Sequence, residues 1–567
     1  MSPMAFGLLL VVLAAPIAVA QKPDSTMDHA HMNHEGMDHG SGSKRMPPMP
    51  KGMTMPAIPG MEGVAPKMTA YLPGADRDPA SIPLAVPRKL LDLKDGDSLD
   101  LTAGFVRRTL RGKTIVMYGF NGQYPGPLIR VKQSAGITIR FRNELDLPSA
   151  VHWHGIRLDN RYDGAVGVTQ AAVPVGGEFI YKIRFPDPGI YWYHPHVRED
   201  VQQDLGLYGN MIVDSPEPNY WNPVNDEQVL MLDDILMDGE GLLPYGRDVA
   251  NYAIMGRFGN VMLINGEPDY HLTAHKGDVV RFLFTNVANS RTMNLSFGGN
   301  PIKLVGADIG RFEREEMVPA VVIAPAQRYV VEVKFDTPGT YAITNQVQAL
   351  NNFLGVFQHT VDTLGLVTVT SQPSAKDLSR EFKTLRTLPQ VSAEFAPYQA
   401  HFDRAPDKEL LLTVNIQGLP ITITAFMSVD TMYFPPQEWV DGMRDMNWVS
   451  TTNEVRWIIR DLQTKKENMD IVWDFKKGDV IKVRMTNDSR SVHPMSHPIH
   501  FHGQRLLVVA RNGVTEDNLV WRDTILLPVG QTVDLLVEAS NPGKWMAHCH
   551  IAEHLEAGMM MVFTVSP

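Results

Sequence analysis

Ten histidines of this 567-residue chain gather in four short clusters, and the single cysteine lies inside the last of them. On an extended strand, side chains two residues apart point to the same face, whereas adjacent side chains point to opposite faces. A His-x-His pair can therefore present two imidazoles to neighbouring metal ions. Imidazole binds copper, zinc, iron and nickel alike, so one pair alone leaves the metal open. The clusters are His152/His154, His194/His196, His497/His500/His502 and His548/Cys549/His550/His554.

The fourth cluster indicates which metal is bound. In His548-Cys549-His550 the two rings share one face of the expected strand, and the thiol points the opposite way. A blue-copper centre requires one thiolate, two imidazoles and a long, weak thioether ligand. A lone thiol in such a centre would be metal-bound instead of free. The residues available for this centre are Cys549, His497, His554 and Met559.

Eight clustered histidines remain after these ligands are set aside. Eight imidazoles can hold three copper ions at low coordination, which leaves open positions for dioxygen. The peptide that joins Cys549 to its two neighbours would link the two centres covalently and give electrons a short route between them. The eight are His152, His154, His194, His196, His500, His502, His548 and His550.

Two sequence elements that could position these clusters recur three times in the same order. The first is an alternating, strand-like run that ends in a turn residue, and the second is a Pro-Gly pair that opens another strand. This recurrence predicts three homologous β domains, each long enough for a Greek-key β-sandwich, and hence an all-β fold. The runs are residues 136–143, 276–286 and 477–487, and the pairs begin at Pro188, Pro338 and Pro542.

The repeats also predict which domains hold metal. Histidines stand five and seven residues after Gly189 and again after Gly543, whereas the same offsets from Gly339 give Thr344 and Gln346. The middle domain therefore lacks the ligands. The predicted boundaries are 88–215, 222–372 and 409–567 for the domains, with a charged, irregular linker at 373–408.

The N-terminal part of the chain differs from the rest. Residues 1–20 contain a short apolar run and end in Ala18-Val19-Ala20, which predicts a signal peptide and export to the periplasm or the extracellular space. No Lys or Arg precedes the apolar run, and an N-terminal anchor is the alternative. Residues 21–87 hold four histidines and nine methionines without hydrophobic periodicity, which predicts disorder. This segment either captures copper or serves as a linker.

The clusters resemble the four copper motifs of the three-domain multicopper oxidases, a family that includes laccases and bacterial copper-efflux and copper-resistance oxidases. The resemblance covers residues 88–567 and implies cupredoxin-like domains with four copper ions. It implies that His497, Cys549, His554 and Met559 form the type 1 site, although Met560 and Met561 leave the axial register open. It implies type 2 ligands His152 and His500, and type 3 ligands His154, His194, His196, His502, His548 and His550.

Family members also place an acid near the cluster to relay protons. Asp163 resembles that acid by its position after the first motif, and a simple Asp-Gly turn is the alternative reading. Some bacterial members carry an acid directly after the second type 1 histidine. Here that position is Leu555, with Glu553 and Glu556 nearby, so the second relay is not matched.

We therefore expect an enzyme that oxidises a substrate one electron at a time and reduces dioxygen to water. Cuprous ion and phenols or aromatic amines are both possible substrates. Thioethers favour copper(I), but methionines also fill gaps in protein cores. A copper-sequestering protein with incidental oxidase activity is the alternative from another class, and a copper nitrite reductase fits less well because both His548 and His550 are present. The methionines in question are Met427, Met432, Met443 and Met446.

The net charge of −11 argues against nucleic acid as a partner, because phosphate binding requires a basic surface. No stretch beyond the N-terminal run is long and apolar enough to span a bilayer, so we expect no stable membrane insertion. The expected partners are dioxygen and a small reducing substrate or cuprous ion.

Overall fold

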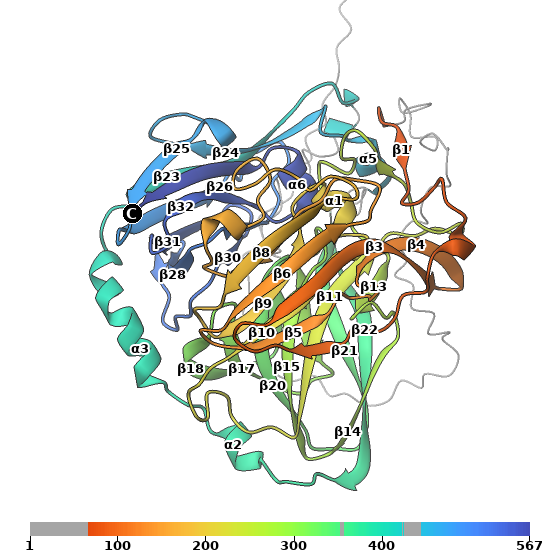
Figure 1. The fold of residues 1–567 in the computed structure, drawn as a ribbon. Coiled ribbons are helices and arrows are strands. Elements are labelled where there is room, and N and C mark those ends of the chain that lie inside the picture. The colour runs from red at the N-terminus through yellow and green to blue at the C-terminus, as the bar shows by residue number, and fades with distance from the viewer. Residues whose placement is uncertain (1–65, 352–355, 422, 425–443) are drawn as a thin grey trace, which may run out of the picture. The chain divides into compact units, whose positions relative to one another are not determined.

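A computed structural model describes residues 66–351, 356–421, 423–424 and 444–567. The predicted signal peptide and residues 21–65 of the Met/His-rich segment lie outside the described residues, as do Met427, Met432 and Met443. Within the described part of the chain, no helix has both the length and the apolar character needed to cross a membrane. Figure 1 shows that strands dominate the fold, which confirms the prediction of an all-β protein.

The first domain consists of two sheets whose facing side chains form a shared core. The four-stranded sheet has the order β4-β3-β6-β8, and the five-stranded sheet has the order β2-β5-β10-β9-β7. The strands are β2 (Leu90–Asp92), β3 (Ser98–Leu110), β4 (Lys113–Phe120), β5 (Leu128–Lys132), β6 (Gly136–Asn143), β7 (Val151–His154), β8 (Glu178–Arg184), β9 (Gly189–Pro195) and β10 (Gly209–Asp214).

The middle domain repeats this plan with longer strands. Its sheets have the orders β13-β11-β15-β20-β17-β18 and β14-β22-β21-β16-β19. The strands are β11 (Asp226–Ile235), β13 (Val261–Ile264), β14 (Tyr270–Lys276), β15 (Asp278–Asn286), β16 (Met293–Phe297), β17 (Ile302–Ala307), β18 (Arg311–Val318), β19 (Val321–Ile323), β20 (Arg328–Phe335), β21 (Gly339–Asn351) and β22 (Val356–Pro373).

The third domain has the same two-sheet arrangement, with the orders β24-β23-β26-β31-β28-β29 and β25-β33-β32-β27-β30. Its core draws side chains from both sheets, and Cys549 belongs to that core. The strands are β23 (Lys408–Ile416), β24 (Val455–Asp461), β25 (Val472–Lys476), β26 (Val480–Asn487), β27 (His497–Phe501), β28 (Arg505–Arg511), β29 (Val514–Thr515), β30 (Thr524–Leu527), β31 (Thr532–Glu538), β32 (Gly543–Cys549) and β33 (Met560–Ser566).

The repeated sequence runs become β6, β15 and β26, which occupy equivalent places in their sheets. β6 alternates between buried and more exposed side chains, as expected for a strand with one solvated face. Every residue of β15 is buried. The reason is that the middle domain packs against the first through an apolar cluster to which Leu283 of β15 contributes, together with Ile190 and Ile212. Such burial contributes about 1.5–3 kcal/mol for each large apolar side chain.

The three Pro-Gly pairs begin β9, β21 and β32, and their glycines share one backbone conformation. The φ angles are 156° at Gly189, 154° at Gly339 and 146° at Gly543. Residues with a Cβ avoid this region, so glycine sets the direction in which each strand starts. This common start explains why histidines fall at the same offsets in the first and third domains.

The segment between the second and third domains is more regular than expected. Residues 373–408, predicted to be an irregular linker, contain three helices, and the apolar side chains of Leu378, Phe382 and Phe395 in this segment are buried. The helices of the described residues are η1 (Pro79–Ser81), η2 (Asn160–Tyr162), α1 (Glu199–Gln202), α2 (Ser379–Lys383), α3 (Pro389–Phe395), η3 (Ala396–His401), α5 (Arg444–Val449), η4 (Asn468–Asp470) and α6 (Ala552–Glu556).

Residues 66–87, expected to belong to the disordered segment, are ordered. β1 (Ala70–Tyr71) pairs with β12 (Tyr245–Gly246), and the Tyr71 hydroxyl donates to Asp146 Oδ1 at 2.9 Å. Ile82 is buried in the core of the first domain. The short segment lacks hydrophobic periodicity, but a few anchoring side chains are enough to hold it against the folded domains.

Candidate metal centre

Two strand pairs, one in each outer domain, bring the histidine clusters together. In the first domain, β7 pairs with β9 so that His152 lies opposite His194. In the third domain, β27 pairs with β32 so that His500 lies opposite His548. Antiparallel pairing therefore places two sequence motifs side by side in each domain.

The eight rings form one cluster with residues of both outer domains, and its shortest centroid distances are 3.7 Å for His154–His500 and 3.9 Å for His152–His502. We divide this cluster into two groups of three and one pair, each of which contains residues of both outer domains. Ring centroids in the first group are 5.6 Å apart for His154–His194 and 5.0 Å for both His154–His550 and His194–His550. The second group is His196, His502 and His548, with centroids 5.1–5.3 Å apart. His152 and His500 form the remaining pair at 5.6 Å. The cluster therefore lies at the interface of the first and third domains.

The ring nitrogens fit a metal cluster. One nitrogen of most rings is held by a protein oxygen, as for His152 Nδ1 with the Asp163 carbonyl at 2.7 Å and His194 Nδ1 with the Pro195 carbonyl at 2.8 Å. A neutral imidazole that donates from one nitrogen presents a lone pair on the other. Several ring nitrogens among the described residues have no hydrogen-bond partner and are free to bind a metal. They include Nε2 of His152, His194, His196 and His500, Nδ1 of His154, and both nitrogens of His550.

Burial keeps these rings in the form that binds metal. Burial lowers the pKa of His502 to about 4 and that of His550 to about 3, and it also lowers the pKa of His497 to about 3. All three rings are therefore neutral at neutral pH, which metal coordination requires.

Cys549 has surroundings of its own on the other side of its strand. Its Sγ lies 3.6 Å from His497 Nδ1 and 3.8 Å from His554 Nδ1, and those two nitrogens are 3.3 Å apart. Two backbone hydrogen bonds hold Met559 beside this site. The Met559 carbonyl accepts from Cys549 N–H at 3.0 Å, and the Met559 N–H donates to the His554 carbonyl at 2.9 Å. Burial raises the pKa of the Cys549 thiol, so a thiolate at this place needs a cation to stabilise it.

Comparisons with known proteins identify the family. Three multicopper oxidase family models match residues 105–218, 220–365 and 430–567. The chain belongs to the multicopper oxidase family. It is 24% identical to dihydrogeodin oxidase of Aspergillus terreus (85% of this chain, 84% of the relative) and 26% identical to multicopper oxidase MmcO of Mycobacterium tuberculosis (81% and 85%).

A solved multicopper oxidase from Campylobacter jejuni, a metallo-oxidase, has the same fold, with a TM-score of 0.63, 21% identity and coverage of 89% of this chain and 99% of that one. The family confirms the predictions of cupredoxin-like domains, copper cofactors and an oxidase that uses dioxygen and a reducing substrate.

Asp163 of this oxidase lies at the histidine cluster and also ends a turn. It follows the short helix η2, yet its buried carboxylate faces inward, with Oδ2 2.8 Å from His502 Nδ1. Burial alone would raise the pKa of Asp163, but His502 and His152 outweigh it and hold the pKa below its ordinary value. An ionised carboxylate that accepts from Nδ1 orients the ring and leaves Nε2 for a metal.

Several residues around the oxidase centres were missed by the motif analysis. Asp523 is fully buried and contacts rings from both outer domains, and Glu199 Oε1 lies 3.2 Å from His196 Nδ1. Trp457 stacks on His554 at 4.1 Å. The available signal for Asp523 was the polar stretch Arg522-Asp523-Thr524 between the apolar residues 519–521 and 525–527, because a buried charge needs a partner.

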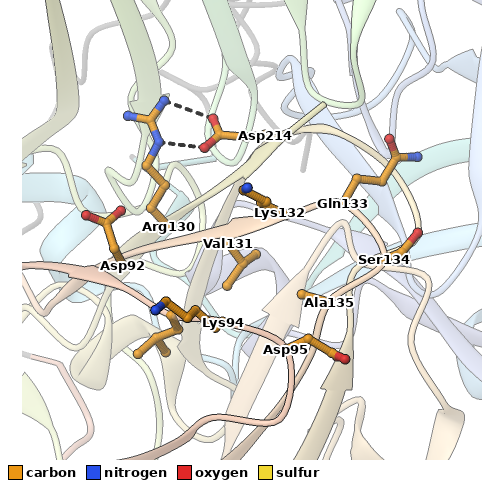
Figure 2. A pocket seen from close by; sticks show the side chains of 11 residues that line it. Asp92, Lys94, Asp95, Arg130, Val131, Lys132, Gln133, Ser134, Ala135 and Asp214 are labelled. Atoms are coloured by element: carbon orange, nitrogen blue, oxygen red, sulfur yellow. Dashed lines mark hydrogen bonds and ion pairs between the residues drawn. The ribbon is translucent and has the colours of Figure 1, made fainter. Parts of the chain in front are cut away.

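One pocket of the first domain lies apart from the histidines. It has a volume of about 540 Å³, and Figure 2 shows the Arg130 guanidinium directed at Asp214, with N–O distances of 2.8 and 2.9 Å. Its lining contains no histidine, cysteine or methionine, and every lining residue is described. The pocket therefore offers no ligand set for copper.

Proposed function

We propose that Cys549, His497, His554 and Met559 hold a type 1 copper, and that the eight other histidines hold a three-copper cluster. The observation that carries this proposal is the alternation at His548-Cys549-His550. The sulfur faces His497 and His554, whereas the His550 ring joins the first group of histidines and the His548 ring joins the second. In this assignment His152 and His500 bind the type 2 ion, and the two groups of three bind the type 3 pair.

Bound copper supplies the one-electron redox chemistry that couples substrate oxidation to the reduction of dioxygen to two waters. The chain contributes fixed positions, neutral imidazoles and a covalent path of adjacent residues between the two ligand groups. A preorganised, buried donor set keeps reorganisation small, which is how a protein tunes such a site. The spectroscopic test of these ligand roles is given in the Discussion.

The substrate we propose is cuprous ion. The sequence segment that contains Met427, Met432, Met443 and Met446 ends in α5. Ser450, which follows α5, contacts the loop that holds His554. Ser450 Oγ accepts from Ile254 N–H at 3.2 Å, and the Ile254 carbonyl lies 3.2 Å from His554 Nε2. A thioether-rich segment next to this ring would concentrate copper(I) where electrons enter.

The described end of the N-terminal Met/His-rich segment lies in the same region. Lys67 Nζ is 3.6 Å from Glu454 Oε1, and the Thr69 carbonyl accepts from Arg247 N–H at 2.8 Å. Described residues next to both methionine-rich segments therefore contact the loop near His554 or residues beside it. This convergence supports copper(I) as the substrate.

We also propose export, with a mature chain that begins at Gln21, which N-terminal sequencing tests.

Rates with cuprous ion and with a phenol test the substrate proposal. The deletion should cover residues 21–65 only, because residues 66–87 pack against the domains. We expect this deletion, combined with leucine at the four internal methionines, to lower kcat/KM for cuprous ion about tenfold or more, that is ~1.4 kcal/mol, and to leave the phenol rate within about twofold. The four methionines are Met427, Met432, Met443 and Met446.

A matched control is Met469→Leu, at an exposed methionine outside these segments. It should change neither rate. Unaltered cuprous oxidation in the combined variant would show that the methionines do not gather the substrate.

We propose that Asp163 relays protons to the cluster and orients His502. Asp163→Asn keeps the size of the side chain and removes its charge, so we expect dioxygen turnover to fall about 10- to 100-fold. Copper content and turnover should be measured together. If turnover equals that of the unmodified oxidase, Asp163 does not relay protons and serves only as a turn residue.

A further inference from the structure

Arg328 belongs to the middle domain, which supplies none of the predicted copper ligands, yet its side chain contacts all three domains. It is fully buried at the start of β20. Its Nε donates to the Ile190 carbonyl of the first domain at 2.9 Å, and Nη1 donates to the Ala326 carbonyl of its own domain at 3.0 Å. Nη1 also donates to Asp523 Oδ1 of the third domain at 2.6 Å, and Nη2 donates to Oδ2 of the same carboxylate.

Asp523 in turn holds one ring from each outer domain. Its Oδ1 lies 3.0 Å from His154 Nε2, and its backbone carbonyl lies 2.9 Å from His500 Nδ1. Thr524 Oγ1 is a second partner for His154 Nε2, at 3.1 Å. The two rings stack with their centroids 3.7 Å apart. One carboxylate residue therefore positions two of the eight clustered histidines.

The contact with Asp523 decides which nitrogen His154 offers to a metal. A carboxylate can only accept, so His154 Nε2 carries the hydrogen and Nδ1 carries the lone pair. His152, His194 and His500 are held the opposite way, through Nδ1. The reversed tautomer of His154 thus depends on where the Asp523 carboxylate lies.

Arginine is the side chain that can fix this carboxylate. A buried carboxylate needs a counter-charge, and the guanidinium binds both oxygens at once, which sets the plane of the carboxylate. Gly155 makes room for the pair, because a Cβ there would lie against Asp523 Oδ2 and 2.9 Å from Arg328 Nη2. The glycine of the His152-Trp-His-Gly155 motif therefore allows the ion pair to reach the ring.

We infer that Arg328 is a positioning residue for the copper cluster, acting through Asp523 on the ligand nitrogens of His154 and His500. The middle domain thereby takes part in building a metal site whose ligands all come from its neighbours. This inference rests on the proposed ligand roles of His154 and His500. A purely mechanical role, in which Arg328 only ties the domains together, makes a different prediction.

The test compares copper-loaded, full-length Arg328→Gln and Arg328→Lys with the unmodified oxidase and with Arg522→Gln. Arg522 is a matched control, because it is buried and lies near Asp308 as Arg328 does: Arg522 Nη1 is 3.5 Å from Asp308 Oδ2, and Arg328 Nη1 is 3.5 Å from Asp308 Oδ1. Of the two guanidiniums, that of Arg328 is the one that pairs with Asp523. The readouts are copper per chain during chelator titration, the type 2 signal in electron spin resonance, the blue absorption and the melting temperature.

We expect Arg328→Gln to weaken copper binding at the cluster about 10- to 100-fold and to change the type 2 hyperfine splitting, while the blue absorption persists. Arg328→Lys keeps the positive charge but lacks the paired N–H donors of the guanidinium, and it should change the type 2 hyperfine splitting less. Arg522→Gln should leave copper affinity and splitting unchanged, whatever happens to its melting temperature.

A lowered melting temperature in Arg328→Gln with unaltered copper affinity and type 2 splitting would overturn the inference in favour of a mechanical tie. If Arg328→Gln does not fold, Arg328→Lys decides by the same two readouts. The unmodified oxidase must first show four copper ions and a blue band. If the unmodified oxidase lacks four copper ions or the blue band, the proposed ligand roles are wrong. If it has both, but the Arg328 variants keep normal copper affinity and type 2 splitting, the role of Arg328 is wrong.

Discussion

Cys549→Ser is expected to abolish the intense blue absorption of the copper-loaded oxidase and to lower dioxygen consumption at least about a thousandfold, or about 4 kcal/mol. The serine hydroxyl has nearly the same size but is a poor ligand for copper, so the packing of the third-domain core is kept while the thiolate is lost. The fold should therefore survive. The measurements are the visible spectrum, copper per chain and the rate of dioxygen uptake with cuprous ion.

The three-copper cluster provides the internal control for Cys549→Ser. The rings that we propose as its ligands include His548 and His550, which point to the side of β32 opposite Cys549, so the variant should lose about one copper per chain and retain the type 2 resonance signal. A blue band that survives the substitution would contradict the assignment of Cys549. Loss of every copper would indicate that the two sites do not bind independently.

His548→Gln is expected to give the complementary result, in which blue absorption is kept and dioxygen reduction is lost. His548 Nε2 lies 3.0 Å from His502 Nε2, within the group that we assign to one type 3 ion. Its neighbour Cys549 contacts a different set of residues. Substrate added in air should bleach the blue band of the variant, and the colour should return at least about a hundredfold more slowly than in the unmodified oxidase, or ~2.7 kcal/mol.

His271→Gln is a matched control for this experiment. His271 is exposed on β14 of the middle domain, and its Nε2 contacts Thr368 Oγ1. The control should recover its colour at the normal rate. Rapid recovery in His548→Gln itself would remove His548 from the cluster.

The features that sequence predicted well depend on local geometry. Alternation along a strand is a property of neighbouring residues, so the opposite directions of Cys549 and its flanking histidines followed from their spacing. The Pro-Gly repeats likewise located His194 and His548 at equivalent places, because Gly189 and Gly543 share one backbone conformation.

The features that sequence missed depend on contacts between distant parts of the chain. Arg328 and Asp523 are 195 residues apart, and neither belongs to a periodic pattern. The complete burial of β15 follows from packing between domains, which hydrophobic alternation within one strand does not encode. The ordered stretch at residues 66–87 depends on a few anchors, such as Tyr71 and Ile82, in a segment whose composition favours disorder.

Anomalous X-ray scattering at the copper edge from crystals of the copper-loaded oxidase tests the central claim most directly. We expect one copper bound by Cys549, His497 and His554, and three more among the eight clustered histidines, with His548 and His550 on different ions. Fewer than three peaks among the histidines, or a peak that Cys549 shares with a ring of His548 or His550, would contradict the account.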